Sequence, residues 1–214
     1  LFNGATLNIL NNSQIVNNHA LSAEGGAVAA GGASNINIAD ATLRDNTAGG
    51  NGGAIYTNGG TLDFTGGWVL RQNTAGANGG AVAAVGDAVA SFTAGSYSLV
   101  YFNRAEGGHG GMVYLGNSSM TELHAVAGSQ MYIYANYASE NGGALYAGNG
   151  GHFDVYGQVS FDHNRADNGG AIYLGVGYEL TATDTDLTDN TSYYSSGAGL
   201  QAAEAQRLYN EAVA

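Results

Sequence analysis

The stretch NGGAIY occupies residues 51–56, and it returns as NGGALY at residues 141–146 and as NGGAIY at residues 168–173. Its Gly-Gly-Ala portion starts at Gly25, Gly52, Gly79, Gly142 and Gly169, and related phrases start at Gly110 and Ser196. Successive starts are 27, 27, 31, 32, 27 and 27 residues apart. A period in this range is typical of repeat proteins, in which each repeat packs on its neighbours.

A second phrase keeps the same period and consists of an apolar residue, two variable residues and an asparagine. These asparagines are Asn18, Asn46, Asn73, Asn103, Asn136, Asn164 and Asn190. Between the two phrases lie apolar residues separated by one position, such as Leu62 and Phe64. This alternation is typical of β-strands, and the Gly, Asn, Asp, Ser and Thr residues between them indicate turns.

The repeat predicts an all-β fold, a right-handed parallel β-helix of about seven rungs, with about 27 residues and three short strands per rung. In one rung we expect the strands at residues 52–57, 61–65 and 68–72, and the handedness follows from the crossover rule. The solenoid is expected to span residues 1–199. Residues 200–214 are rich in helix formers and are predicted to form a helix that caps or links the rod.

The fourth position of the Gly-Gly-Ala phrase is apolar in six rungs, where it holds Val28, Ile55, Val82, Val113, Leu145 and Ile172. These side chains are expected to stack as an inward row of the core. Strand alternation places Ala54 and Tyr56 on the opposite, outer face. The same outer row contains the tyrosines Tyr56, Tyr114, Tyr146 and Tyr173. This row is a candidate binding surface for sugars or proteins; the alternative is a ladder of rings that only covers the rod.

The recurring asparagines are predicted to have a structural role. Stacked amides can bond from rung to rung and can satisfy the backbone groups of turns. The predicted ladder contains Asn46, Asn73, Asn103, Asn136, Asn164 and Asn190. A catalytic amide would not recur in every rung.

Composition excludes several classes of partner. The chain has a net charge of −12, only five basic residues, and neither cysteine nor proline. Nucleic acids and anionic membranes bind basic surfaces, so we expect neither as a partner. No stretch is long and apolar enough for a membrane helix, and we expect no membrane insertion of this segment. Disulfides and thiolate metal sites are ruled out, and we expect no cofactor.

No set of residues predicts catalysis, and the chain is therefore not expected to be an enzyme. The densest group of carboxylates is Asp184, Asp186 and Asp189, which is a candidate Ca²⁺ site if carbonyl oxygens complete it. The alternative is a solvated acidic turn without an ion.

Two adjacent rungs are longer than the others. The extra residues fall within residues 83–98 and 115–130, and they are expected to stack into one bulge. Such insertions often belong to a binding face, and neutral drift in a surface turn is the alternative. Asn117 lies in this bulge within an Asn-x-Ser sequon and is the candidate glycosylation site; Asn190 also lies in a sequon but is expected to be bare.

The Gly-Gly-Ala and apolar-x-x-Asn phrases resemble the GGAI and FxxN repeats of chlamydial polymorphic outer-membrane proteins. The first phrase matches in five copies, whereas FxxN is literal only at residues 161–164. The resemblance implies a surface-exposed β-helix adhesin at the cell surface or outside the cell. It covers most of the chain, and the membrane-embedded barrel of that family is not part of this sequence.

We therefore expect an extracellular structural or adhesive solenoid, in which copies associate with one another as filaments or bind other surface proteins. Two alternatives remain at this point. One is a carbohydrate-active β-helix lyase or hydrolase, and the other is a glycan-binding module that uses the outer tyrosine row.

Overall fold

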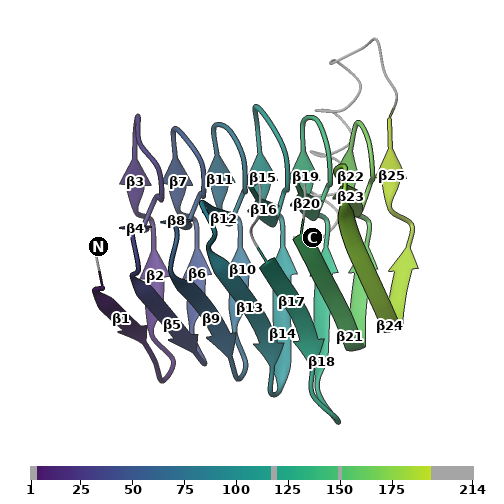
Figure 1. Ribbon diagram of the computed structural model, residues 1–214, viewed down its shortest axis with the longest axis horizontal. Helices are drawn as coiled ribbons and strands as arrows, with labels where there is room; N and C mark the ends of the chain where they lie inside the picture. Colours follow the sequence, from purple (N-terminus) through teal and green to yellow (C-terminus); the bar gives the residue numbers. More distant parts are fainter. Residues whose placement is uncertain (1–3, 117–119, 149–150, 194–214) are drawn as a thin grey trace, which may run out of the picture.

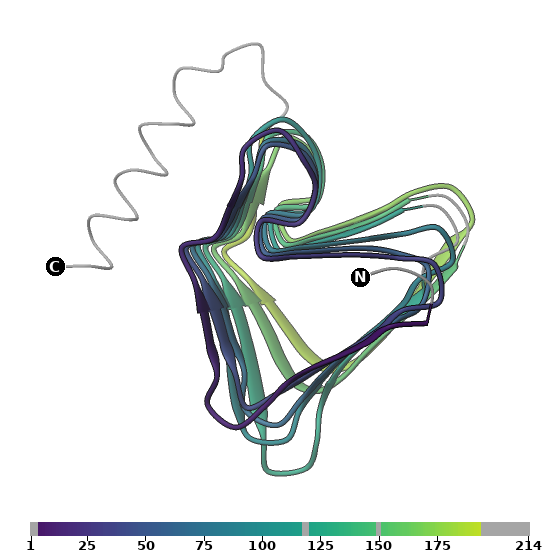
Figure 2. The ribbon, with the colours of Figure 1, turned by 90° about the vertical axis from the view of Figure 1, so that its left-hand side faces the viewer.

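The computed structural model describes residues 4–116, 120–148 and 151–193. The chain winds into a parallel β-helix, and viewed along the rod its rungs superimpose as a three-sided coil with a hooked corner (Figures 1 and 2). The predicted all-β fold and parallel stacking are confirmed. The right-handed sense stays a prediction, and the helix predicted at residues 200–214 lies outside the described residues.

Three parallel sheets form the sides. The six-stranded sheet contains β4 (Val28–Gly31), β8 (Ile55–Asn58), β12 (Val82–Val85), β16 (Val113–Leu115), β20 (Leu145–Ala147) and β23 (Ile172–Leu174). The seven-stranded sheet contains β3 (His19–Ala20), β7 (Thr47–Ala48), β11 (Thr74–Ala75), β15 (Arg104–Ala105), β19 (Tyr137–Ala138), β22 (Arg165–Ala166) and β25 (Thr191–Ser192).

The twelve-stranded sheet covers two sides of the coil. Its first side contains β1 (Thr6–Ile9), β5 (Asn35–Ala39), β9 (Thr61–Thr65), β13 (Val89–Ala94) and β17 (Met120–Ala125). Its second side contains β2 (Gln14–Val16), β6 (Thr42–Arg44), β10 (Val69–Arg71), β14 (Tyr97–Tyr101) and β18 (Gln130–Tyr134). The long strands β21 (Gly151–Asp162) and β24 (Tyr178–Thr188) turn the corner between the two sides. Each complete rung therefore contains a two-residue strand that was not predicted, and in the rungs of β21 and β24 one long strand replaces two of the three predicted strands.

The apolar row of the Gly-Gly-Ala phrase is in register across all six rungs. Successive pairs run from Val28 and Ile55 to Leu145 and Ile172. The members in the middle of the rod are fully buried, whereas Val28 and Ile172 near its ends are partly buried. The outward placement of Ala54 was wrong, because Ala54 precedes β8, where strand alternation does not apply, and it is fully buried in the core.

Aromatic rings fill the core between the two sides of the large sheet. Phe64 and Phe92 come from adjacent rungs, and their rings stack with centroids 4.8 Å apart. Trp68 packs against both rings, at 5.1 Å and 5.7 Å. Its indole Nε1–H donates to the carbonyl oxygen of Thr93 at 3.2 Å, so this fully buried side chain has a partner for its polar atom.

The two glycines of the repeated phrase have different roles, seen at Gly52 and Gly53. Gly52 has a φ of 69°, a left-handed conformation that side chains disfavour. Gly53 lies against the next rung, where an added Cβ would be 2.0 Å from the carbonyl oxygen of Gly80 and 2.7 Å from the backbone of Thr74. The first glycine therefore permits the turn, and the second permits close approach of the hooked corner.

Asparagine side chains join the rungs at the corner that precedes the hooked corner in the chain. The backbone N–H and the Nδ2 of Asn46 both donate to Oδ1 of Asn73, at 3.1 Å and 3.0 Å, and Nδ2 also donates to the carbonyl oxygen of Ile15. The same side-chain bonds connect Asn73, Asn103, Asn136, Asn164 and Asn190 in turn. The residue before each asparagine has a φ between 50° and 57°, so a left-handed residue aims every amide into the stack.

Within the described residues, no segment is a helix that could cross a membrane.

We predict that Asn73→Ala destabilises the rod. The change removes the acceptor of two donors of Asn46 and the donor to the carbonyl of Leu43, all in a buried corner. Unsatisfied buried groups cost about 1–3 kcal/mol each, and urea unfolding should show a loss of at least that size. The matched control is Asn37→Ala, which removes an exposed amide bond to Asn8 and should change stability by less than about 0.5 kcal/mol. Equal losses in the two variants would contradict a structural role for the buried stack.

Candidate functional site

The predicted tyrosine row lies on the outer face of the six-stranded sheet. Its members pair in register in the order Tyr56, Ala83, Tyr114, Tyr146 and Tyr173. The rings of Tyr114 and Tyr146 stack at 5.2 Å, and those of Tyr146 and Tyr173 stack at 5.4 Å, with 5° between the planes in both pairs. Ala83 interrupts the row, so Tyr56 is separated from the other three rings by one rung.

A second ladder of polar side chains runs beside these rings, at the end of the hooked corner. Asn51 donates to the carboxylate of Glu24, and Asn78 donates to Oδ1 of Asn51 at 2.8 Å. In the next rung a histidine replaces asparagine. The backbone N–H of His109 donates to Oδ1 of Asn78, and its ring nitrogen Nδ1 lies 2.9 Å from Nδ2 of Asn141.

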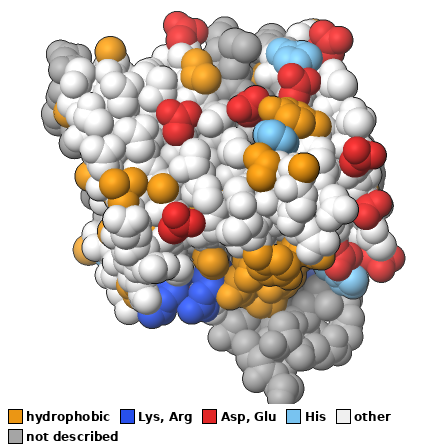
Figure 3. Space-filling view, turned by 90° about the horizontal axis from the view of Figure 1, so that it is seen from below, with side chains coloured by type: hydrophobic (Ala, Val, Ile, Leu, Met, Phe, Trp, Pro, Cys, Tyr) orange, Lys and Arg blue, Asp and Glu red, His pale blue; other side chains and the backbone are white. Residues whose placement is uncertain are grey.

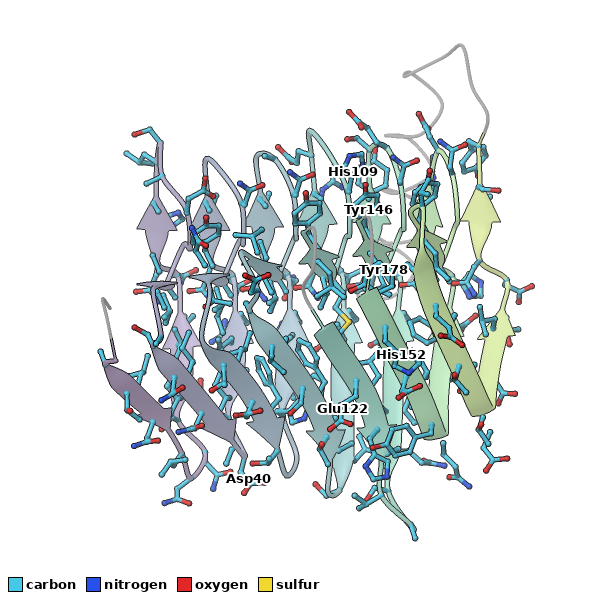
Figure 4. The ribbon with its side chains drawn as sticks, viewed as in Figure 1. Asp40, His109, Glu122, Tyr146, His152 and Tyr178 are labelled. Carbon is cyan, nitrogen blue, oxygen red and sulfur yellow. The ribbon has the colours of Figure 1, made fainter. Side chains whose placement is uncertain are left out.

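His109 therefore belongs to both stacks. Its ring is 4.4 Å from that of Tyr146 and nearly parallel to it, and the two residues lie together in Figure 4. Because the amide of Asn141 can only donate to Nδ1, the neutral tautomer with a proton on Nε2 fits this site. Nε2 lies 3.4 Å from the carboxylate of Glu140. Burial lowers the pKa of His109, and the charge of Glu140 offsets part of that shift.

Burial also raises the pKa values of Tyr114 and Tyr146. For Tyr114 desolvation is the cause, and for Tyr146 the neighbouring tyrosines and Glu140 add to desolvation. The rings of Tyr114 and Tyr146 are partly buried and stay protonated at neutral pH, so they offer stacked ring edges and neutral hydroxyl groups. We call Tyr114, Tyr146, Tyr173 and His109 the tyrosine face.

A second aromatic surface lies on the outside of β6, β10, β14 and β18, and the sequence analysis did not single it out. Tyr101 and Tyr134 stack at 5.0 Å, Phe102 packs edge-on against both, and Tyr97 contacts Tyr132 at 5.1 Å. Arg71 lies 5.9 Å from the ring centre of Tyr101. We call this surface the Arg–Tyr face; it contains Arg44, Arg71, Tyr97, Tyr101, Phe102, Tyr132 and Tyr134.

Most residues of the Arg–Tyr face belong to the two long rungs. The corner after β13 lies beside the corner after β17, since the N–H of Val126 donates to the carbonyl of Ala94 and that of Gln130 donates to the carbonyl of Ser96. The extra residues of the two rungs therefore do stack at this corner, and β14 and β18 each start two residues earlier than the pairing with β10 requires. The signal in the sequence was the pair LVY at residues 99–101 and YIY at residues 132–134, which occupy equivalent places in the two long rungs.

Outward carboxylates and histidines gather on the other side of the large sheet, on β17, β21 and β24. Glu122 and Asp154 are register partners, and Glu122 and His152 lie on the sheet that faces the viewer in Figure 4. His152 contacts Asp154 at 2.7 Å, and the hydroxyl of Tyr156 donates to Glu122 at 3.2 Å. Each carboxylate thus has a polar side-chain partner within the protein.

The candidate Ca²⁺ residues do not come together as predicted. In the described part of the chain, the group of three possible metal ligands is Asp162, His163 and Asp189, whose donor atoms lie within 4.8 Å of one another. Asp184 and Asp186 are exposed on β24 and do not belong to this group. Two carboxylates and one imidazole form a donor set for Zn²⁺ or Mn²⁺ rather than for the all-oxygen coordination of Ca²⁺.

Two of the sequon asparagines are Asn117, the candidate glycosylation site, and Asn190, which is expected to be bare. Asn117 lies outside the described residues. Asn190 ends the buried ladder, donating to the carbonyl of Phe161 at 2.8 Å and accepting from Asn164, so its amide nitrogen is already engaged.

We predict that His109 makes the stability of the rod depend on pH. Its pKa is lowered on folding, so its contribution is complete above about 6.5, the ordinary histidine value, and is lost as the pH falls through the lower folded pKa. Protonation would also place a donor opposite the amide of Asn141. Unfolding curves at pH 5 and pH 7 should differ less in His109→Asn, which restores the amide, than in the wild type. The same change in the exposed residue His19 is the control, and equal pH dependence in His109→Asn and the wild type would contradict the prediction.

Comparison with known proteins supports the repeat assignment. A family model described as the Chlamydia polymorphic membrane protein repeat matches residues 40–58 and 158–175. Both segments contain the ladder asparagine, the hooked corner and the Gly-Gly-Ala strand, in the same order and geometry. Neither a curated protein nor a solved structure matches the chain. Two segments of this β-helix therefore match the Chlamydia polymorphic membrane protein repeat.

Proposed function

We propose that this chain is an adhesive segment of an extracellular or cell-surface solenoid, in which repeated inward residues build a rod and varied outward residues contact partners. One observation supports this division. Corner and core positions hold the same residue types from rung to rung, whereas register partners on the outside differ, as at Tyr56, Ala83 and Tyr114. The scaffold is therefore constrained by folding, and the outer faces are open to change.

The tyrosine face is the proposed contact surface for a glycan or a surface protein. Its three stacked rings extend over consecutive rungs, and tyrosine combines apolar ring area with a polar hydroxyl group, a combination enriched at binding surfaces. Rings held by stacking and by the ladder at His109 lose little conformational freedom when a partner binds.

We expect beads coated with this protein to bind cultured epithelial cells, and the double variant Tyr146→Ala, Tyr173→Ala to bind about tenfold more weakly. The matched control is Thr181→Ala, an exposed position on another side of the rod. Flow-chamber counts of retained beads would measure the effect. Retention no better than that of albumin-coated beads, or equal retention of both variants, would contradict the proposal.

The second candidate is a carbohydrate-active enzyme, and the observation that favours it is the register pairing of Glu122 with Asp154. Glycosidases use two carboxylates, of which one must act as an acid. We propose instead that these carboxylates are structural, because His152 and Tyr156 engage one each.

Accordingly, incubation with neutral and acidic polysaccharides should release no reducing ends or unsaturated products. The assay is run with and without Ca²⁺ and Zn²⁺. Turnover that disappears in Glu122→Gln, or in Asp184→Asn and Asp186→Asn, would establish an enzyme and replace the adhesive proposal.

A further inference from the structure

The Arg–Tyr face has an ordered sequence of charges along the rod. Its outward row runs, in strict register, through Arg44, Arg71, Tyr101, Tyr134, Asp162 and Thr188. Figure 3 shows the result: a hydrophobic patch lies between basic side chains on one side and acidic and histidine side chains on the other. One end of the face is therefore basic, its middle is aromatic and its other end is acidic.

The charges at the two ends cannot neutralise each other within one copy. Arg71 and Asp162 are three rungs apart, about 14 Å at the spacing of paired strands. Arg71 contacts Gln72 and the ring of Tyr101, and no carboxylate pairs with it in the part of the chain that the structure describes. Asp162 contacts His163 at 2.6 Å.

We propose that the Arg–Tyr face binds the same face of a second copy, with the two rods antiparallel. A two-fold axis between the rungs of Tyr101 and Tyr134, perpendicular to the rod, exchanges the two ends of the row. Arg71 of each copy then lies opposite Asp162 of the other, and the two tyrosines of each copy lie opposite those of the other. A two-fold contact of this kind is self-complementary.

The neighbouring rows fit the same axis. The left-handed residues before the asparagines include Phe102 and Ala135, and the axis places the large side chain of each copy against the small one of the other. In the row on the other side, Leu99 comes opposite Tyr132. Large side chains therefore meet small ones, and apolar side chains meet apolar ones.

The outer end of the row is also compatible with this arrangement. Arg44, which contacts Asp45 at 2.5 Å, comes opposite Thr188 and next to Asp189. Asp45 and Asp189 face each other, and the charge of Arg44 offsets both carboxylates.

Other occupants fit the face less well. Two rods in parallel would place Arg71 against Arg71 and Asp162 against Asp162, and like charges opposite one another are unfavourable. An extended acidic polymer bound along Arg44 and Arg71 would reach the acidic end of the row and be repelled there. The separation of a basic end from an acidic end along the row therefore favours a second, antiparallel copy of this chain as the occupant.

The contact is small. Six rungs span about 24 Å along the rod and five residues span about 17 Å across it, which gives a footprint on the order of 400 Å² per copy. Stable interfaces bury about 800 Å² per partner, so we expect a weak dimer with a dissociation constant of roughly 10–500 µM. The measurement must therefore reach high protein concentrations.

Sedimentation equilibrium of two charge-reversal variants tests the proposal. Arg71→Glu places a glutamate opposite Asp162, and Asp162→Arg places an arginine opposite Arg71, so each variant alone should associate at least tenfold more weakly than the wild type. An equimolar mixture of the two should regain association, because each copy then meets an opposite charge at both ends. Circular dichroism of each variant first establishes that it is folded.

The controls separate this face from the tyrosine face. Arg104→Glu, on β15, and the double variant Tyr146→Ala, Tyr173→Ala should dimerise as the wild type does, whatever their effect on adhesion. A wild-type protein that is monomeric up to about 1 mM would overturn the proposal, since this exceeds the expected dissociation constant. A mixture that associates no better than its components would overturn the antiparallel geometry. Binding of the wild type to heparin with no dimer in its absence would identify an acidic polymer as the occupant instead.

Discussion

The buried amide stack at the corner before the hooked turn is the interaction on which this fold depends. A β-helix must change chain direction at every corner, and each corner leaves backbone N–H and C=O groups without strand partners. Here one asparagine per rung, such as Asn73, accepts from two donors of the previous rung and donates to a backbone carbonyl of that same previous rung. Since the asparagine is fully buried in the middle rungs, removing its side chain would leave these buried polar groups without a partner.

The glycine pair is the steric counterpart of this polar constraint. Gly53 and its equivalents allow the hooked corner to fold back on the backbone of the next rung, and the small alanines Ala105, Ala138 and Ala166 fill the space inside. The geometry of the corners therefore determines the repeat period, the corner residues and the inward apolar positions at the same time. For this reason the register of the six-stranded sheet and the roles of Asn46 to Asn190 could be inferred from sequence spacing alone.

Apart from the tyrosine row, the surfaces could not be inferred in the same way. The prediction that Ala54 faces outward was wrong because alternation holds only inside a strand, and Ala54 lies in the turn before β8 that the glycines create. The Arg–Tyr face was missed because Tyr97 and Tyr132 depend on two longer strands whose starts the sequence does not mark. Asp162 and Asp189 are 27 positions apart and become neighbours only through stacking, whereas Asp184 and Asp186 are close in sequence but belong to no group of three ligands within the described residues.

The two polar ladders run in opposite directions along the rod. In the first, each amide nitrogen donates toward the following rung, from Asn18 to Asn190; in the second, Asn51, Asn78 and Asn168 donate toward the preceding rung, ending at the carboxylate of Glu24. Their side-chain dipoles therefore oppose each other. An α-helix adds a parallel dipole with every residue and accumulates partial charge at its ends. Each turn of this coil adds side-chain dipoles of opposite direction, so the two ladders do not accumulate partial charge at the ends of the rod as rungs are added.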